Sequence, residues 1–166
     1  MSHPESIGAL SAALISELLA AGKFVSTAES CTGGWIAKSL TDNSGSSGCF
    51  GYGLVSYSNG AKESLLGVNP TTLKHYGAIS EAVVKEMAEG ALNLSGADIA
   101  AAVSGVAGPE GHTEEKPVGT VWFAWATRNK DKSHIDAEKR LLKGERERIR
   151  AQTVIIALQG VRERIR

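Results

Sequence analysis

A serine among small and polar residues stands out at positions 27–34, which read Thr-Ala-Glu-Ser-Cys-Thr-Gly-Gly. We expect Ser30 at a turn between a strand and a helix, where glycines let the backbone approach a ligand closely. Unpaired N–H groups at such a turn can hold an oxyanion or a phosphate, and those of Thr32, Gly33 and Gly34 are the candidates. The pattern predicts a nucleophile, although a serine that simply caps a helix is a common alternative.

A nucleophilic serine requires a base, because its hydroxyl is barely ionised at neutral pH. None of the four histidines is convincing, since each falls near a terminus, a turn, a loop or an edge strand. They are His3, His75, His112 and His134. A lysine can replace histidine when desolvation lowers its pKa. Lys62 is the attractive choice, because a strand end and a helix start would present it on the same side of a sheet as Tyr57. A solvated lysine in a first helical turn is the alternative.

The last sixth of the chain is basic, with nine Lys or Arg residues against three Glu residues from Lys139 onward. Guanidinium groups bind phosphate through two hydrogen bonds, so Arg146 is the preferred phosphate partner and Arg150, one helical turn later, the second choice. The positive charges are interleaved with glutamates and no aromatic residue accompanies them. A mostly solvated helix face is therefore expected here rather than a nucleic-acid groove.

Helical and strand patterns alternate along the chain. Apolar spacing predicts helices over 7–21, 35–40 and 80–94, one that contains Lys62, and one from about residue 145; strands are predicted over 23–27, 52–58, 98–104, 120–127 and 133–142. This order predicts an α/β fold, a three-layer α/β/α sandwich with a mixed, mostly parallel sheet that ends in an antiparallel hairpin. The glycine- and proline-rich segment 105–118 is a candidate functional loop.

Composition narrows the class of protein. A length of 166 residues fits one domain, 1–166, and 42% hydrophobic with 22% charged residues excludes a disordered chain. A net charge of zero argues against nucleic acid or an anionic membrane as partner. Two cysteines and no apolar leader favour a reduced cytoplasm. Glu114 and Glu115 lack partners with ligand spacing, so neither a metal nor another cofactor is expected.

Four segments appear in the same order as in a known family: TAESCTGG, VSYSNGAK, SGVAGPEG and EEKPVGTVWFA. Over residues 10–158 the chain resembles the CinA C-terminal domain family, whose characterised members are nicotinamide-nucleotide amidases. The resemblance implies hydrolysis of the carboxamide of nicotinamide mononucleotide to nicotinate mononucleotide and ammonia, without a metal, in pyridine-nucleotide salvage. It implies Ser30 as nucleophile, Lys62 as base and Tyr57 as an assisting phenol.

The same resemblance extends to the substrate side of the site. Gly105 and Gly108 match the family's glycine loop, which implies a close approach of backbone to the ribose or the base ring. Arg146 matches a Gly-x-Arg pattern. Small α/β enzymes are often symmetric, so a homodimer or a higher homo-oligomer is expected.

One segment departs from the family, since residues 49–53 are more glycine-rich and less charged than expected there. This departure bears on the choice of substrate more than on the reaction. Three other functions remain open. They are a catalytically silent nucleotide-binding module, an amidase for a different amide, and a protein that acts near nucleic acid, which the neutral charge disfavours.

Overall fold

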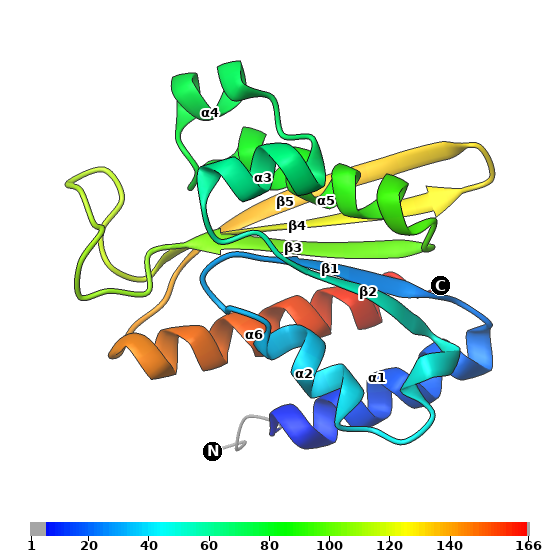
Figure 1. Cartoon of the computed structure of the whole chain (residues 1–166). Helices are drawn as coiled ribbons and strands as arrows, with labels where there is room; N and C mark the ends of the chain where they lie inside the picture. Colours follow the sequence, from blue (N-terminus) through cyan, green and yellow to red (C-terminus); the bar gives the residue numbers. More distant parts are fainter. Residues whose placement is uncertain (1–5, 166) are drawn as a thin grey trace.

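The computed structural model describes residues 6–165, and His3 lies outside the described residues. Five strands form one open sheet in the order β2-β1-β3-β4-β5 (Figure 1). They are β1 (Val25–Glu29), β2 (Phe50–Val55), β3 (Ile99–Gly105), β4 (Thr120–Asn129) and β5 (Lys132–Leu141). Strand β1 is parallel to both β2 and β3, whereas β3–β4 and β4–β5 are antiparallel pairs. The mixed sheet and its final antiparallel hairpin are confirmed.

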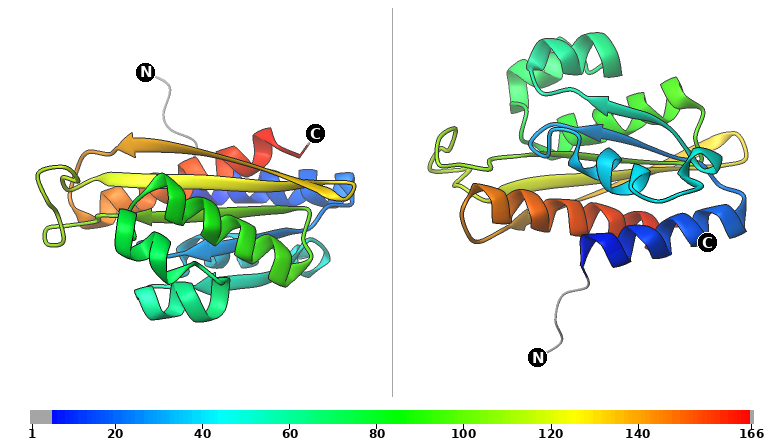
Figure 2. Two further views of the ribbon diagram at one scale, coloured as in Figure 1. Left: turned by 90° about the horizontal axis from the view of Figure 1, so that it is seen from above. Right: turned by 60° about the horizontal axis from the view of Figure 1, so that its bottom comes forward.

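Helices cover both faces of the sheet, which confirms the three-layer arrangement (Figures 1 and 2). One face carries α1 (Ile7–Ala21), α2 (Trp35–Thr41) and α6 (Arg146–Glu163). The other face carries α3 (Asn59–Leu66), α4 (Pro70–Tyr76) and α5 (Glu81–Ser95). The helix that precedes β1 ends at Gly22, which adopts the left-handed conformation typical of a glycine C-cap.

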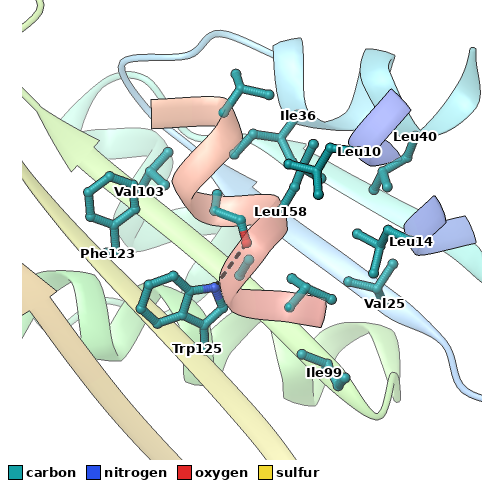
Figure 3. Packing of buried hydrophobic residues seen from close by; sticks show 14 of the residues in the cluster. Leu10, Leu14, Val25, Ile36, Leu40, Ile99, Val103, Phe123, Trp125 and Leu158 are labelled. Carbon is teal, nitrogen blue, oxygen red and sulfur yellow. Dashed lines mark hydrogen bonds between the residues drawn. The ribbon is translucent and has the colours of Figure 1, made fainter. Parts of the chain in front are cut away.

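The two faces of the sheet are packed differently, because successive side chains of a strand point to opposite sides. Beneath the sheet, large side chains such as Phe123, Trp125 and Leu158 fill the space against α1, α2 and α6 (Figure 3). The indole Nε1 of Trp125 donates a hydrogen bond of 3.1 Å to the carbonyl oxygen of Ala157. On the face above the sheet the buried apolar strand residues are all alanines, and the larger Leu54, Trp122 and Ile135 are only partly buried there. The alanines are Ala28, Ala100, Ala102, Ala124 and Ala126.

The chain changes faces between its first two crossovers. It leaves β1 toward α2 on one face, and it leaves β2 toward α3 and α5 on the other (Figure 1). Parallel strands end at the same edge of a sheet, so the segments that follow β1, β2 and β3 meet there. The crevice between β1 and β3 at this edge is the usual ligand position in open α/β sheets.

Candidate active site

A cavity of about 240 Å³ lies at this edge of the sheet. Its walls come from the turn after β1, the segment after β2, the residues just before α5 and the loop after β3, and the first residue of α6 closes it. The lining residues are Ser30, Cys31, Tyr57, Asn59, Lys62, Ala78, Ile79, Ser104, Gly105, Val106, Ala107, Gly108, Glu110, Gly111 and Arg146. Segments from most of the chain therefore contribute to one pocket.

Ser30 and Lys62 are in direct contact in this cavity. The Nζ atom of Lys62 lies 3.1 Å from the Oγ atom of Ser30, and the lysine side chain is only 1% exposed. Ser58 caps α3 and fixes the first turn from which Lys62 extends. The backbone N–H of Ser30 donates to the carbonyl oxygen of Val103, which anchors the serine to β3. The structure thus brings together the two residues that the sequence analysis paired.

The surroundings of Lys62 suit a neutral amine. Its Nζ atom is 3.0 Å from the carbonyl oxygens of both Ser56 and Tyr57, and none of the ion pairs found in residues 6–165 involves it. Burial disfavours the charged form and lowers the pKa of Lys62 below its ordinary value, against a smaller opposing effect of Cys31. Lys62 donates to the Oγ atom of Ser30 in this structure. A neutral amine would keep two N–H donors for the two carbonyls and would have a lone pair that could accept the proton of Ser30.

Tyr57 contributes its backbone to the pair and its phenol to another neighbour. The carbonyl oxygen of Tyr57 accepts from Lys62 and lies 3.4 Å from the Oγ atom of Ser30. Its side chain is 60% exposed, and the phenol oxygen lies 3.4 Å from Nη2 of Arg146. The phenol contacts Arg146 rather than Ser30 or Lys62, which already contact each other directly. Its assistance in proton transfer stays a prediction.

The residue before Ser30 has a role that the sequence analysis missed. Glu29 is fully buried, and its carboxylate accepts hydrogen bonds from the backbone N–H groups of Ile36 and Ala37 at 2.8 and 3.0 Å. It also accepts a hydrogen bond from the hydroxyl of Thr32. Glu29 therefore caps α2, and the simple N-cap interpretation of Ser30 is wrong, because α2 begins at Trp35. An acidic residue shortly before a glycine-rich helix start is a recognisable capping signal.

This capping changes where an anion can bind. The N–H groups at the start of α2 are already used by Glu29, and the N–H of Gly33 donates to the carbonyl of Ser30. Within the described chain, the N–H groups of Cys31 and Thr32 have no backbone acceptor. Thr32, Gly33 and Gly34 do not line the cavity with their side chains or backbone surface. The predicted donors Thr32, Gly33 and Gly34 thus lie outside the cavity lining, and the unpaired N–H of Cys31, which does line it, is the better-placed oxyanion donor.

The glycine loop and Arg146 lie together on the opposite wall. A Cβ atom on Gly105 would lie 2.8 Å from the carbonyl oxygen of Thr120, and Gly108 has a φ of +80°. Both positions therefore need glycine, as a close backbone approach and a left-handed conformation respectively. Nη1 of Arg146 donates to the carbonyl oxygen of Gly108 at 2.8 Å. The predicted ligand residues Gly105, Gly108 and Arg146 are thus brought to one cavity.

Arg150 and the glycine-rich segment lie elsewhere. The guanidinium of Arg150 donates to the carbonyl oxygens of Cys31 and Thr32 and does not line the cavity. Residues 49–53 lead into and form part of edge strand β2, outside the cavity lining. A Cβ on Gly53 would lie 2.9 Å from the Cβ of Ala37, so this glycine lets α2 pack closely on β2. Within the segment that was expected to depart from the family, Gly53 therefore serves helix packing.

Other residues of the lining were not singled out from the sequence. Asn59 begins α3, Glu110 belongs to the glycine loop, and Ala78 is held by a 2.9 Å hydrogen bond from the hydroxyl of Ser104 to its carbonyl. No periodic pattern marks them, because they lie in turns and at element ends. Among residues 6–165 no cluster of three metal-ligating side chains is found. None of the helices in the same range has the length and apolar character to cross a membrane.

The fold and the site together define an α/β protein with a buried serine–lysine contact at the carboxyl ends of parallel strands, an arrangement suited to acyl transfer. The sequence profile of the CinA C-terminal domain matches residues 8–165, and the chain belongs to this family. A protein named nicotinamide-nucleotide amidohydrolase PncC from Enterobacter agglomerans is 52% identical over 150 residues, which cover 90% of each chain.

Two further comparisons agree with this assignment. The protein of the same name from Escherichia coli strain K12 is 51% identical over 142 residues, covering 86% of this chain and 84% of that one. The crystal structure of the competence/damage inducible protein CihA from Agrobacterium tumefaciens is 42% identical, covers 98% of both chains and superposes with a TM-score of 0.91. The family predicted from four sequence segments is confirmed.

Proposed function

We propose that this protein hydrolyses the carboxamide of nicotinamide mononucleotide to nicotinate mononucleotide and ammonia, with Ser30 as nucleophile and Lys62 as base. The observation that carries the proposal is the 3.1 Å contact between a buried lysine amine and a serine hydroxyl in the cavity. Relatives about half identical to this chain bear the name of the same activity. No metal or other cofactor takes part in the proposed reaction.

The proposed reaction has two stages. Lys62 accepts the proton of Ser30 as the serine oxygen bonds to the amide carbon, and the former carbonyl oxygen takes the negative charge. The C–N bond then breaks and Lys62 gives its proton to the departing ammonia. Water attacks the resulting ester, loses a proton to Lys62 and forms the acid. The proton returns to Ser30 as the ester bond breaks.

Substrate binding in this proposal involves the opposite wall of the cavity. Arg146 lies at the mouth between the glycine loop and the phenol of Tyr57, where a guanidinium suits a phosphate. The proposal also includes a reducing cytoplasm, which is supported by Cys31 and Cys49, both buried and unpaired. Burial raises the pKa of Cys31 to about 12, so its thiol is a poor competitor of Ser30.

The first experiment measures ammonia release from nicotinamide mononucleotide by the wild type, Ser30→Ala and Lys62→Ala. We expect each substitution to lower turnover by at least about 100-fold, because nucleophile and base act as one unit. Circular dichroism checks that the variants are folded. Unchanged turnover in Ser30→Ala would refute the proposed nucleophile. Saturable binding in a calorimeter without any product would instead identify a nucleotide-binding module.

A further inference from the structure

Two charged side chains hold the turn after β1 from outside the cavity. Glu29 takes the N–H groups of α2 and the hydroxyl of Thr32, as described above. Arg150, on α6, takes the carbonyl side of the same turn: Nε lies 3.0 Å from the oxygen of Cys31, and Nη2 lies 3.1 Å from the oxygen of Thr32. One guanidinium therefore fixes two consecutive peptide groups next to the nucleophile.

The Ser30–Cys31 peptide links these contacts to the site. The N–H of Cys31 has no backbone acceptor among the described residues, and Cys31 lines the cavity beside Ser30. On one side of this peptide the Ser30 N–H is held by the carbonyl oxygen of Val103, and on the other side the Cys31 carbonyl is held by Arg150. The peptide unit is planar, so fixing its two neighbours limits the directions in which the Cys31 N–H can point. Loss of the Arg150 contacts would remove one of these two supports.

We propose that Arg150 is a positioning residue for the oxyanion hole: it fixes the turn after Ser30 so that the Cys31 N–H donates to the charged oxygen of the reaction. The inference rests on the proposed acyl transfer at Ser30. It also replaces phosphate binding as the role of Arg150. Two of its nitrogens are already used by carbonyls, and its guanidinium lies 5.6 Å from the ring centre of Trp35.

Alignment of such a donor matters in the transition state and little in the ground state. Loss of one oxyanion donor lowers turnover by about 100- to 1,000-fold in other acyl-transfer enzymes. Removal of the Arg150 contacts would misalign the donor without deleting it. We therefore expect a smaller loss, of about 10- to 100-fold in kcat, while KM changes by no more than about two-fold. A phosphate contact behaves differently, because its loss raises KM and affects only substrates that carry the phosphate.

The first test uses a fluorophosphonate probe, which needs no knowledge of the natural substrate. The Ser30 oxygen bonds to phosphorus, fluoride leaves and Lys62 takes the serine proton, while the phosphoryl oxygen occupies the oxyanion hole. We expect Arg150→Met to slow labelling at least about 10-fold. Arg148→Met is the matched control, since Arg148 is exposed on the same helix, and its labelling rate should stay within about two-fold.

Three results of this labelling test would overturn the inference or redirect it to a second variant. Labelling of Arg150→Met at the wild-type rate would overturn it. Failure of the wild type to be labelled would overturn both the inference and the nucleophile. If Arg150→Met does not fold, Arg150→Lys takes its place: it keeps the charge but lacks the planar fork in which two separate nitrogens each meet one carbonyl, so slower labelling is again expected and a wild-type rate overturns the inference.

The second test compares nicotinamide mononucleotide with nicotinamide riboside, which lacks the phosphate. Arg150→Met should lower kcat by the same factor on both substrates, whereas Arg146→Met should raise KM on the mononucleotide alone. A loss confined to the phosphorylated substrate in Arg150→Met would overturn the inference and assign Arg150 to the phosphate. Slow labelling of Arg150→Met, in a protein whose wild type hydrolyses neither compound, would refute the proposed substrate and leave the positioning role intact.

Discussion

Lys62 is the residue whose environment differs most from that expected of its type. A lysine that is 1% exposed has lost its hydration, and only neutral oxygens replace it: the hydroxyl of Ser30 and the carbonyls of Ser56 and Tyr57. An acidic partner would hold the amine in its charged form, which has no lone pair. Neutral acceptors leave burial as the main influence on its pKa.

The pH dependence of turnover should follow from this environment. The proposed base would act in its neutral form, so turnover is expected to rise with pH as Lys62 loses its proton. Burial lowers the pKa of Lys62 below its ordinary value of 10.5. The increase in turnover should therefore be centred at a lower pH than it would be for an exposed lysine. Measurement of kcat between about pH 6 and 10 tests this. A rise centred at or above the ordinary value would contradict it.

The same residues show what sequence reasoning can and cannot identify. Ser30 and Lys62 belong to continuous motifs, and a serine without a histidine partner directs attention to lysine. The contacts of Arg150 and Glu29 depend on which atoms of the turn remain free, and no spacing in the sequence encodes this. Arg150 was expected to bind a phosphate because a guanidinium suits one. In the structure the same N–H donors are used by backbone carbonyl oxygens instead.

At the scale of elements, the crossing of α3 and α5 positions the proposed base. A Cβ atom on Gly90 of α5 would lie 1.9 Å from the carbonyl oxygen of Leu66, the last residue of α3. Glycine is therefore required where the two helices touch. Lys62 lies one turn earlier on α3, so a displacement of this helix would move the amine relative to Ser30.

Gly90→Ala should consequently reduce both stability and turnover. We expect a loss of about 1–3 kcal/mol in the free energy of unfolding, since the added methyl meets backbone rather than a movable side chain. Urea denaturation and kcat measure the two effects. Gly8→Ala is the matched control: it lies on α1 with nothing within 4 Å of the added carbon, and alanine should stabilise that helix slightly. Equal effects of the two substitutions would exclude the steric explanation.

Most elements could be predicted because their apolar periodicity or their caps are clear, as for α1 with Gly22 and α5 with Ser80. Helix α4 was missed, since seven residues with one buried apolar side chain give no periodic signal. Its start was nevertheless encoded, because Asn69 caps it and Pro70 occupies the first turn. The start of α2 at Trp35 agrees with the predicted range 35–40, but its cap by the side chain of Glu29 was missed.

At the scale of the whole molecule, the sheet separates two cores of different character. The face toward α1, α2 and α6 is filled by large side chains, and the face toward α5 by alanines. Helix α5 contacts β1, β2, β3, β4 and β5, so a single helix spans the alanine face. A close approach over small residues explains how 15 residues can cover that surface.

Enlarging a residue on the alanine face should therefore separate the layers. Ala102→Leu, at a position that is 1% exposed on the central strand, is expected to lower the free energy of unfolding by about 1–3 kcal/mol. Ala9→Leu, on an exposed position of α1, should change it by less than about 0.5 kcal/mol. Comparison of their urea midpoints tests the difference, and a neutral Ala102→Leu would mean that this interface is loosely packed.

The antiparallel hairpin has a practical use in handling the protein. Because β4 leaves the glycine loop and runs antiparallel to β3, the turn at Lys130 and Asp131 lies at the end of the sheet farthest from the cavity (Figure 1). Lys130 has a φ of 60° and both residues are exposed. A dye, an affinity tag or a link to a solid support attached at this tip would project away from the cavity and leave its entrance free.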